Sequence, residues 1–192
     1  MRNFIIFVLF LILIKINEAR LIQAQTPLNR TCLKLGFDHD CDFYSCFEQR
    51  FPCGSSYWIS KWGHKYCLRM KNSLFNFDQD GQLLIEQISM CLMDKLVKQR
   101  YYSLMNINCE QLRAAGQRIV HECYMNNAKL FCTAIHGKNR DCFSKLIDPE
   151  DQHDFSVLRT LANVGQQCNP KKKLSDMRPR GTTNQCSATL SY

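Results

Sequence analysis

The spacing of twelve cysteines constrains this chain more than any other feature of its sequence. They extend from Cys32 to Cys186 without a regular repeat, and none lies in the first 31 residues. A dense, even-numbered set of cysteines is typical of extracellular domains whose cores are held together by disulfides. Zinc sites instead use close Cys-x-x-Cys pairs or clustered histidines, and the sequence has neither. We therefore expect structural disulfides, no bound metal and no cofactor.

An apolar leader at the N-terminus predicts secretion. Arg2 precedes an unbroken apolar run over residues 4–14, which is too short to span about 30 Å of hydrocarbon at 1.5 Å per residue. This pattern is typical of a signal peptide, which is cut after a small residue. Ala19 and Ala24 both fit, and we favour Ala24 because Asn17 is unfavourable three residues before the other cut. The mature chain is therefore expected to be extracellular.

Removal of residues 1–24 leaves a moderately basic chain. It takes away three basic residues and one acidic residue, which lowers the net charge from +8 to +6. We expect one folded domain over residues 25–168 and a flexible basic tail over residues 169–192. The basic residues of this tail are Lys171, Lys172, Lys173, Arg178 and Arg180.

The lysine run at residues 171–173 has three interpretations. It can bind an anionic glycosaminoglycan, mark a proteolytic processing site, or simply be a solvated tail. A charge this moderate does not indicate a nucleic-acid partner.

Apolar residues recur every three to four positions through much of the chain, as in helices that pack on a core. The clearest helices are predicted over residues 81–99 and 109–126, and further ones over 128–135 and 154–165. No segment shows the two-residue alternation of a half-buried strand. The sequence therefore predicts a compact, all-α domain stapled by disulfides.

The first part of the domain, from Cys32 to Tyr66, is rich in cysteine, aromatic and turn residues. We expect short helices there, linked by disulfide-held loops. Trp58 and Trp62 are four positions apart and lie on one face if this segment is helical. We interpret them as core residues rather than as ligand contacts.

One glycosylation sequon occurs, at Asn29-Arg30-Thr31. It lies in polar sequence between the leader and the first cysteine, where an attached glycan would be exposed. Asn29 is therefore the predicted glycosylation site.

A short acidic segment resembles the beginning of a calcium-binding loop. Asn76, Asp78 and Asp80 supply oxygen ligands at alternate positions, and Gly81 follows them. The twelfth position, however, is Gln87 where such loops need a bidentate glutamate. An acidic turn that caps the next helix accounts for the same residues, so calcium binding here is a weak hypothesis.

No motif indicates an enzyme. The chain has no Gly-x-Ser-x-Gly nucleophile elbow, and oxidised cysteines leave no thiolate nucleophile. We therefore assign no catalytic residue and expect a protein that acts by binding.

Several cysteine gaps resemble those of the stanniocalcin family of secreted glycoprotein hormones. Cys32, Cys41 and Cys46 are separated by nine and then five residues, as in that family. The gap of 24 residues from Cys67 to Cys91 and the gap of 14 from Cys109 to Cys123 are also similar.

Two embedded motifs extend the resemblance. Phe77-Asp78-Gln79-Asp80-Gly81 is similar to the Phe-Asp-x-x-Gly of the family, and Glu122-Cys123-Tyr124 to its Glu-Cys-Tyr. The resemblance covers about residues 32–168, most of the mature chain.

The resemblance implies a disulfide pairing that the sequence by itself cannot choose. The implied pairs are Cys32–Cys46, Cys41–Cys67, Cys53–Cys109, Cys91–Cys123 and Cys132–Cys168. Two cysteines stay outside this set. Cys142 has no counterpart in the family, whereas a late cysteine of the family joins two subunits, and Cys186 is the candidate for that role. Cys186 can thus link a homodimer, or Cys142 and Cys186 can pair within one chain.

The resemblance also implies a function. It indicates a hormone that takes part in calcium and phosphate homeostasis by binding an extracellular protein partner or receptor. Inhibition of a secreted metalloprotease of the pappalysin type is the alternative from the same family. An extracellular calcium-binding module that uses the Asn76–Asp80 turn is a third.

Overall fold

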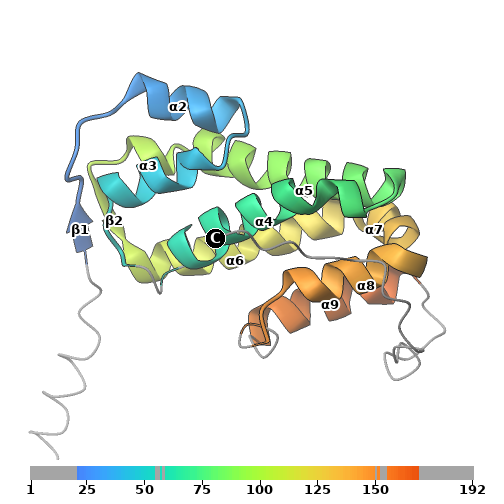
Figure 1. Cartoon of the computed structure of the whole chain (residues 1–192). Coiled ribbons are helices and arrows are strands. Elements are labelled where there is room, and N and C mark those ends of the chain that lie inside the picture. The colour runs from blue at the N-terminus through green and yellow to red at the C-terminus, as the bar shows by residue number, and fades with distance from the viewer. Residues whose placement is uncertain (1–20, 55–56, 58, 150, 152–154, 169–192) are drawn as a thin grey trace, which may run out of the picture.

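The computed structural model describes residues 21–54, 57, 59–149, 151 and 155–168, which are mostly helical (Figure 1). The predicted disulfide-stapled, all-α fold is confirmed. The described α-helices are α2 (Arg30–Phe37), α3 (Asp42–Arg50), α4 (Lys65–Ser73), α5 (Gln79–Lys98), α6 (Cys109–Asn126), α7 (Ala128–Ala134), α8 (Gly137–Leu146) and α9 (Phe155–Cys168). A π-helical turn (Ile59–His64) and two 3-10 turns (Leu74–Asn76 and Tyr101–Ser103) lie between them.

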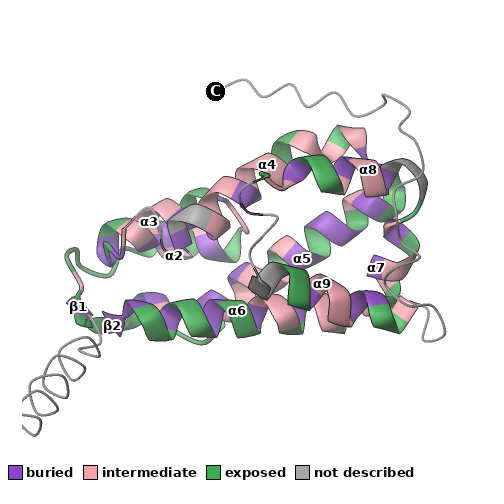
Figure 2. Cartoon of the chain, turned by 90° about the horizontal axis from the view of Figure 1, so that it is seen from below, coloured by how far each residue is buried: buried purple, intermediate pink, exposed green. Residues whose placement is uncertain are grey.

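The two longest helices lie where the apolar periodicity predicts them. Helix α6 has the predicted bounds, and α5 begins two residues earlier and ends one residue earlier than predicted. Each has an N-cap whose side chain accepts a hydrogen bond from the N–H three residues on: Asp78 for α5 and Asn108 for α6. In Figure 2 buried and exposed positions alternate along both helices, as the amphipathic pattern requires.

An aromatic cluster forms the centre of the main core. Phe43, Phe47 and Phe51 of the α3 region are fully buried, and Tyr102 is buried against them. Their ring centroids lie 5.6 to 6.1 Å apart in tilted or edge-on arrangements, which are favourable for aromatic pairs. The first part of the domain is thus held by its aromatic residues as well as by its disulfides.

Helix α8 is not predicted by the sequence pattern. It is largely polar, and only one side of it is apolar. Cys142 and Leu146 on that side are buried in a second, smaller core with Phe77 and Ile85. Its position therefore depends on a surface formed by α5 and the turn before it.

The structure also contains a two-stranded ribbon that the sequence does not predict. Strand β1 (Leu21–Gln23) pairs antiparallel with β2 (Asn106–Asn108), so that Ile22 lies opposite Ile107. Both isoleucines are buried in the main core. Three-residue strands are too short to show an alternating pattern, which explains why the sequence does not indicate them.

Five disulfides are described, and their Cα atoms lie 5.0 to 5.8 Å apart. They are Cys32–Cys46, Cys41–Cys67, Cys53–Cys109, Cys91–Cys123 and Cys132–Cys168. These are the five pairs that the resemblance implies. Cys142 is disulfide-bonded as well, and Cys186 lies outside the described residues. Disulfides in this number fit an extracellular protein.

Some sequence predictions fall on residues that the structure does not describe. These are the apolar leader, Trp58, the first residue of the helix predicted over residues 154–165, and the basic tail at residues 169–192. In the described part of the chain, no helix combines the length and apolar content needed to cross a membrane.

Candidate functional site

Asp78, the central residue of the weak calcium candidate, is the N-cap of helix α5. Its Oδ1 atom accepts hydrogen bonds from the Gly81 N–H, at 3.1 Å, and from the Asn139 amide. Asn139 also accepts the Asp78 N–H, at 3.0 Å. Asn76 and Asp80 lie on either side of this cap, and Asp80 is exposed.

Gly81 leaves room for the Asn139 side chain beside this cap. A Cβ atom at this position would lie 2.8 Å from the side-chain carbon of Asn139, closer than real Cβ contacts allow. Asn139 is itself 1% exposed and belongs to α8. The Phe-Asp-x-x-Gly motif thus has a structural role: Phe77 is buried, Asp78 caps α5, and Gly81 leaves room for the side chain that attaches α8.

Within the described ranges, no group of three or more His, Cys, Asp or Glu residues is placed to hold a metal ion. The calcium hypothesis thus depends on Asp78 giving up hydrogen bonds that it already makes.

A charged cluster joins α4 to the segment after α8. Asp148 is paired with both Lys65 and Arg69, and the hydroxyl of Tyr66 donates to Asp151, at 2.7 Å. The two cations hold the pKa of Asp148 below its usual value, the Arg69 hydrogen bond being the largest cause. Burial raises the pKa of Tyr66, and its hydrogen bond to Asp151 adds to this effect.

A serine, a histidine and an aspartate meet near the π-helical turn. His64 Nε2 lies 3.2 Å from Ser45 Oγ and 3.8 Å from Asp42 Oδ1. In a catalytic Ser-His-Asp triad, the serine hydroxyl contacts one ring nitrogen of the histidine and the carboxylate contacts the other. Here both groups face the same nitrogen, so this arrangement does not activate the serine.

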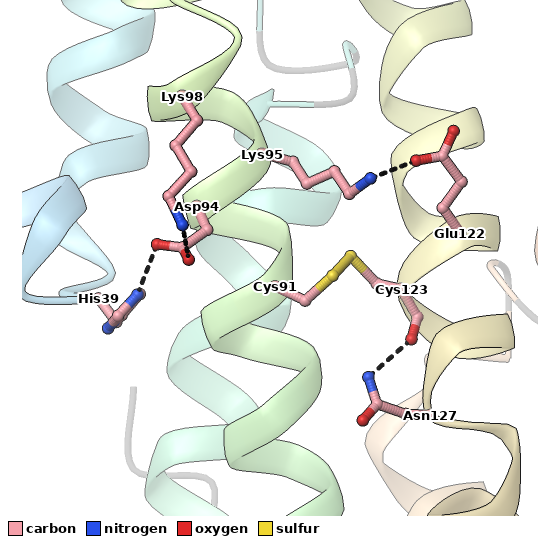
Figure 3. The surroundings of a disulfide bond; sticks show 8 residues. All are labelled: His39, Cys91, Asp94, Lys95, Lys98, Glu122, Cys123 and Asn127. Carbon is pink, nitrogen blue, oxygen red and sulfur yellow. Dashed lines mark hydrogen bonds and ion pairs between the residues drawn. A yellow bond between two sulfur atoms is a disulfide. The ribbon is translucent and has the colours of Figure 1, made fainter.

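Charged pairs flank the Cys91–Cys123 disulfide between α5 and α6 (Figure 3). Asp94 accepts from Lys98, at 2.6 Å, and lies 3.1 Å from His39. These contacts lower the pKa of Asp94, the Lys98 hydrogen bond contributing most.

Beside the disulfide, Lys95 reaches from α5 to Glu122 of α6 and lowers the pKa of that carboxyl group (Figure 3). Asn127 donates to the carbonyl of Cys123, at 2.9 Å. These polar groups connect the α2–α3 link, α5 and α6 around the disulfide, and thus fix the relative positions of these helices.

Arg50 is a buried cation that sequence reasoning did not identify. It is 2% exposed, and its guanidinium donates to the carbonyls of Thr26, Tyr102 (2.9 Å) and Leu104 (3.0 Å). The guanidinium carbon also lies 5.2 Å from the centre of the Phe51 ring. Arg50 therefore holds the N-terminal arm and the link between α5 and α6 against the end of α3.

The predicted glycosylation site, Asn29, caps helix α2. Its Oδ1 accepts the Thr31 N–H at 2.8 Å, and the residue is exposed. The cap uses the amide oxygen and leaves the amide nitrogen, to which a glycan would be attached. Glycosylation of Asn29 therefore stays a prediction.

Trp62 packs as the sequence interpretation suggests. It is partly buried against the main core and stacks on Tyr66, with ring centroids 5.0 Å apart. Lys65, three residues further along the chain, forms an ion pair with Asp148.

Large apolar side chains are exposed at nine of the described positions. They are Leu21, Leu28, Phe37, Phe75, Leu83, Met90, Leu104, Met105 and Leu158. Four of these come from the N-terminal arm and the α5–α6 link, the two segments that Arg50 holds. Met105 is 65% exposed and Leu104 is 41% exposed.

The residues that sequence reasoning missed have a common property. Arg50, Asn139, Asp148 and Asp151 act through partners far away in the chain, and no local motif marks them. The exposed apolar residues are likewise recognised only when burial is known. Comparisons of the chain with models of protein families, with curated proteins and with solved structures found no match.

Proposed function

We propose that this chain is a secreted, helical signalling protein similar to the stanniocalcins. It acts by binding an extracellular protein partner, in the control of calcium and phosphate. The observation that carries the proposal is the disulfide framework: ten cysteines form the five pairs that the resemblance implies. Even six cysteines can pair in 15 different ways, so agreement in the pairing of ten cysteines is specific support for the resemblance.

The contacts of the polar residues also support a binding role. Asp78, Arg50 and Asp148 each connect two separate segments of the chain. A chain held together in this way presents its surface in a fixed form, which lowers the entropy cost of binding a protein.

We place the contact surface at the end of the molecule that carries Leu104 and Met105. These exposed side chains lie on a link whose carbonyl is held by buried Arg50. Apolar side chains in a rigid setting suit a protein partner, because they bury area without first having to be ordered.

Affinity capture from extracellular fluid tests the proposal. The bait is the disulfide-intact protein, and reduced, alkylated protein is the negative control. We expect a captured protein that is lost with a Leu104→Ser/Met105→Ser variant and kept with a Leu83→Ser/Met90→Ser variant on α5. Loss with the α5 pair alone moves the surface to α5, whereas equal capture by intact and reduced protein contradicts the proposal.

The protease alternative is separated by direct assay. If the protein inhibits a secreted pappalysin-type metalloprotease, purified protein slows substrate cleavage without any receptor present. Unchanged cleavage rates at saturating protein remove this alternative.

Two roles of Cys186 stay open: a bond with Cys142 within one chain, and a bond that links a homodimer. Because Cys142 is disulfide-bonded, we favour pairing of Cys142 and Cys186 within one chain. Non-reducing electrophoresis of secreted protein is then expected to show a monomer, and a dimer band that disappears on reduction and in a Cys186→Ser variant contradicts this pairing.

A further inference from the structure

The segment just after the apolar leader is part of the folded domain. Strand β1 pairs with β2, and Ile22, only 8% exposed, lies opposite Ile107 in the main core. The backbone contacts continue beyond the strand. Ala24 N–H donates to the Met105 carbonyl and Gln25 N–H to the Arg50 carbonyl, both at 2.8 Å.

A cut after Ala24 would remove this strand. It would take Ile22 out of the core, expose Ile107 beneath it and leave β2 without a partner. The contacts of Gln25 and Thr26 with Arg50 would then lie directly at a new, charged N-terminus. Lost apolar burial and unpaired backbone groups both destabilise a fold.

The preference for Ala24 in the sequence rests on Asn17 alone, and this argument does not separate the two candidate cuts. Each has alanine immediately before the cut, and each has a residue that is not small two positions earlier: Asn17 for Ala19, and Ile22 for Ala24. Ala19 lies closer to the apolar run, which ends at Ile14. The choice between a cut after Ala19 and a cut after Ala24 therefore depends on the contacts of β1.

We infer that the mature protein begins at Arg20. A signal peptidase hydrolyses the Ala19–Arg20 peptide bond, and water supplies the oxygen of the Ala19 carboxylate and a proton to the new Arg20 amine. The mature chain then keeps β1, and Ile22 belongs to its core. This inference rests on the proposed secretion, but it concerns only where the leader ends.

The direct test is the N-terminus of protein secreted by eukaryotic cells, from Edman degradation and intact mass after deglycosylation. We expect Arg20 as the first residue. Secreted protein that begins at Gln25 overturns the inference and leaves secretion intact. Full-length protein retained in the cell contradicts secretion itself, and the inference with it.

A stability test asks the same question of the folded protein. Ile22→Gln is compared with Gln23→Ala, since Gln23 is the exposed neighbour in the same strand and glutamine, like isoleucine, is not a small residue before the Ala24 cut. If β1 is retained, Ile22→Gln lowers the melting temperature of the secreted protein by about 3–8 °C, and Gln23→Ala changes it little. If the leader ends at Ala24, both secreted variants are identical to the wild type and melt at the same temperature, which overturns the inference.

Discussion

At the scale of single residues, two side chains decide how distant segments fit together. Asn139 and Asp78 form two hydrogen bonds with each other, which join α8 to the beginning of α5. Arg50 replaces the water that three carbonyls would otherwise bind. A buried polar group that has its partners specifies one arrangement, because any shift leaves it unsatisfied.

Gly81→Ala tests the first of these contacts. The added methyl group would overlap the buried Asn139 side chain, so we expect a loss of about 1–3 kcal/mol in the free energy of unfolding. In an Asn139→Ala background the same change should cost much less, because the obstructing side chain is gone. Urea denaturation of the four proteins of this cycle gives the coupling. Additive effects would show that Gly81 is needed for another reason.

Arg50→Met tests the second contact. The buried methionine keeps much of the packing but leaves three carbonyls without their donor, and we expect a loss of about 3 kcal/mol or more. Arg113→Met is the matched control, because Arg113 is exposed and pairs only across the surface of α6. Its loss should be below about 1 kcal/mol. Equal shifts of the two denaturation midpoints would contradict an anchoring role for Arg50.

At the scale of elements, short helices keep their places through contacts with the long ones. Helix α8 is placed by its apolar side and by Asn139, and the segment after it is bound to α4 through Asp148 and Asp151. Helix α9 is tied to α7 by Cys132–Cys168. Isolated helices of these lengths are marginal in water, so tertiary contacts must supply their stability.

Asp148→Asn tests the link between α4 and α8. Since its pKa is lower in the folded than in the unfolded chain, ionised Asp148 stabilises the fold at neutral pH. This contribution is lost as the pH falls below about 4, through the pKa of the folded state. We expect Asp148→Asn to cost about 1–2 kcal/mol at pH 7, with the difference from wild type shrinking toward pH 2.

The control for this experiment is Glu122→Gln, which removes an exposed carboxylate that is also paired with a lysine. Only a small change is expected, since exposed pairs contribute little. Denaturation curves between pH 2 and pH 7 provide the measurement. A deficit of Asp148→Asn that stays constant over this range would show that the charge of Asp148 is not what matters.

At the scale of the whole molecule, disulfides supply stability, and the distribution of charge suggests where an anionic partner would bind. The bridges join residues between 14 and 56 positions apart, and each is worth about 2–4 kcal/mol in the chain-entropy account. Many of the basic side chains on the described surface are neutralised in ion pairs, such as those of Lys34, Lys71 and Lys98. The lysine run at residues 171–173 therefore stands out as the candidate for an anionic partner.

Heparin chromatography tests this candidate. We expect the protein to be retained and to elute with added salt, because exposed charge interactions are screened. Replacement of Lys171, Lys172 and Lys173 by alanine should abolish most of the retention. A Lys34→Ala/Lys71→Ala/Lys98→Ala variant, with the same change in net charge, should be retained more strongly than the tail variant. Equal elution of the two variants would show that net charge alone is responsible.

What the sequence determines by itself is what local spacing can encode. The cysteine content predicts a stapled domain, and the periodicity of apolar residues predicts α5 and α6, because one helix face repeats within a few residues. Asp78 is recognisable as a cap for the same reason. The resemblance adds the pairing of the cysteines, which spacing alone leaves open.

Only the tertiary structure decides the contacts between distant segments. Ile22 lies opposite Ile107, Arg50 reaches the carbonyl of Leu104, and Asn139 meets Asp78. None of these pairs leaves a periodic trace, because each partner is selected by the folded chain and not by its neighbours in sequence. The same holds for β1, whose contacts with β2 are the basis of the inferred cut after Ala19.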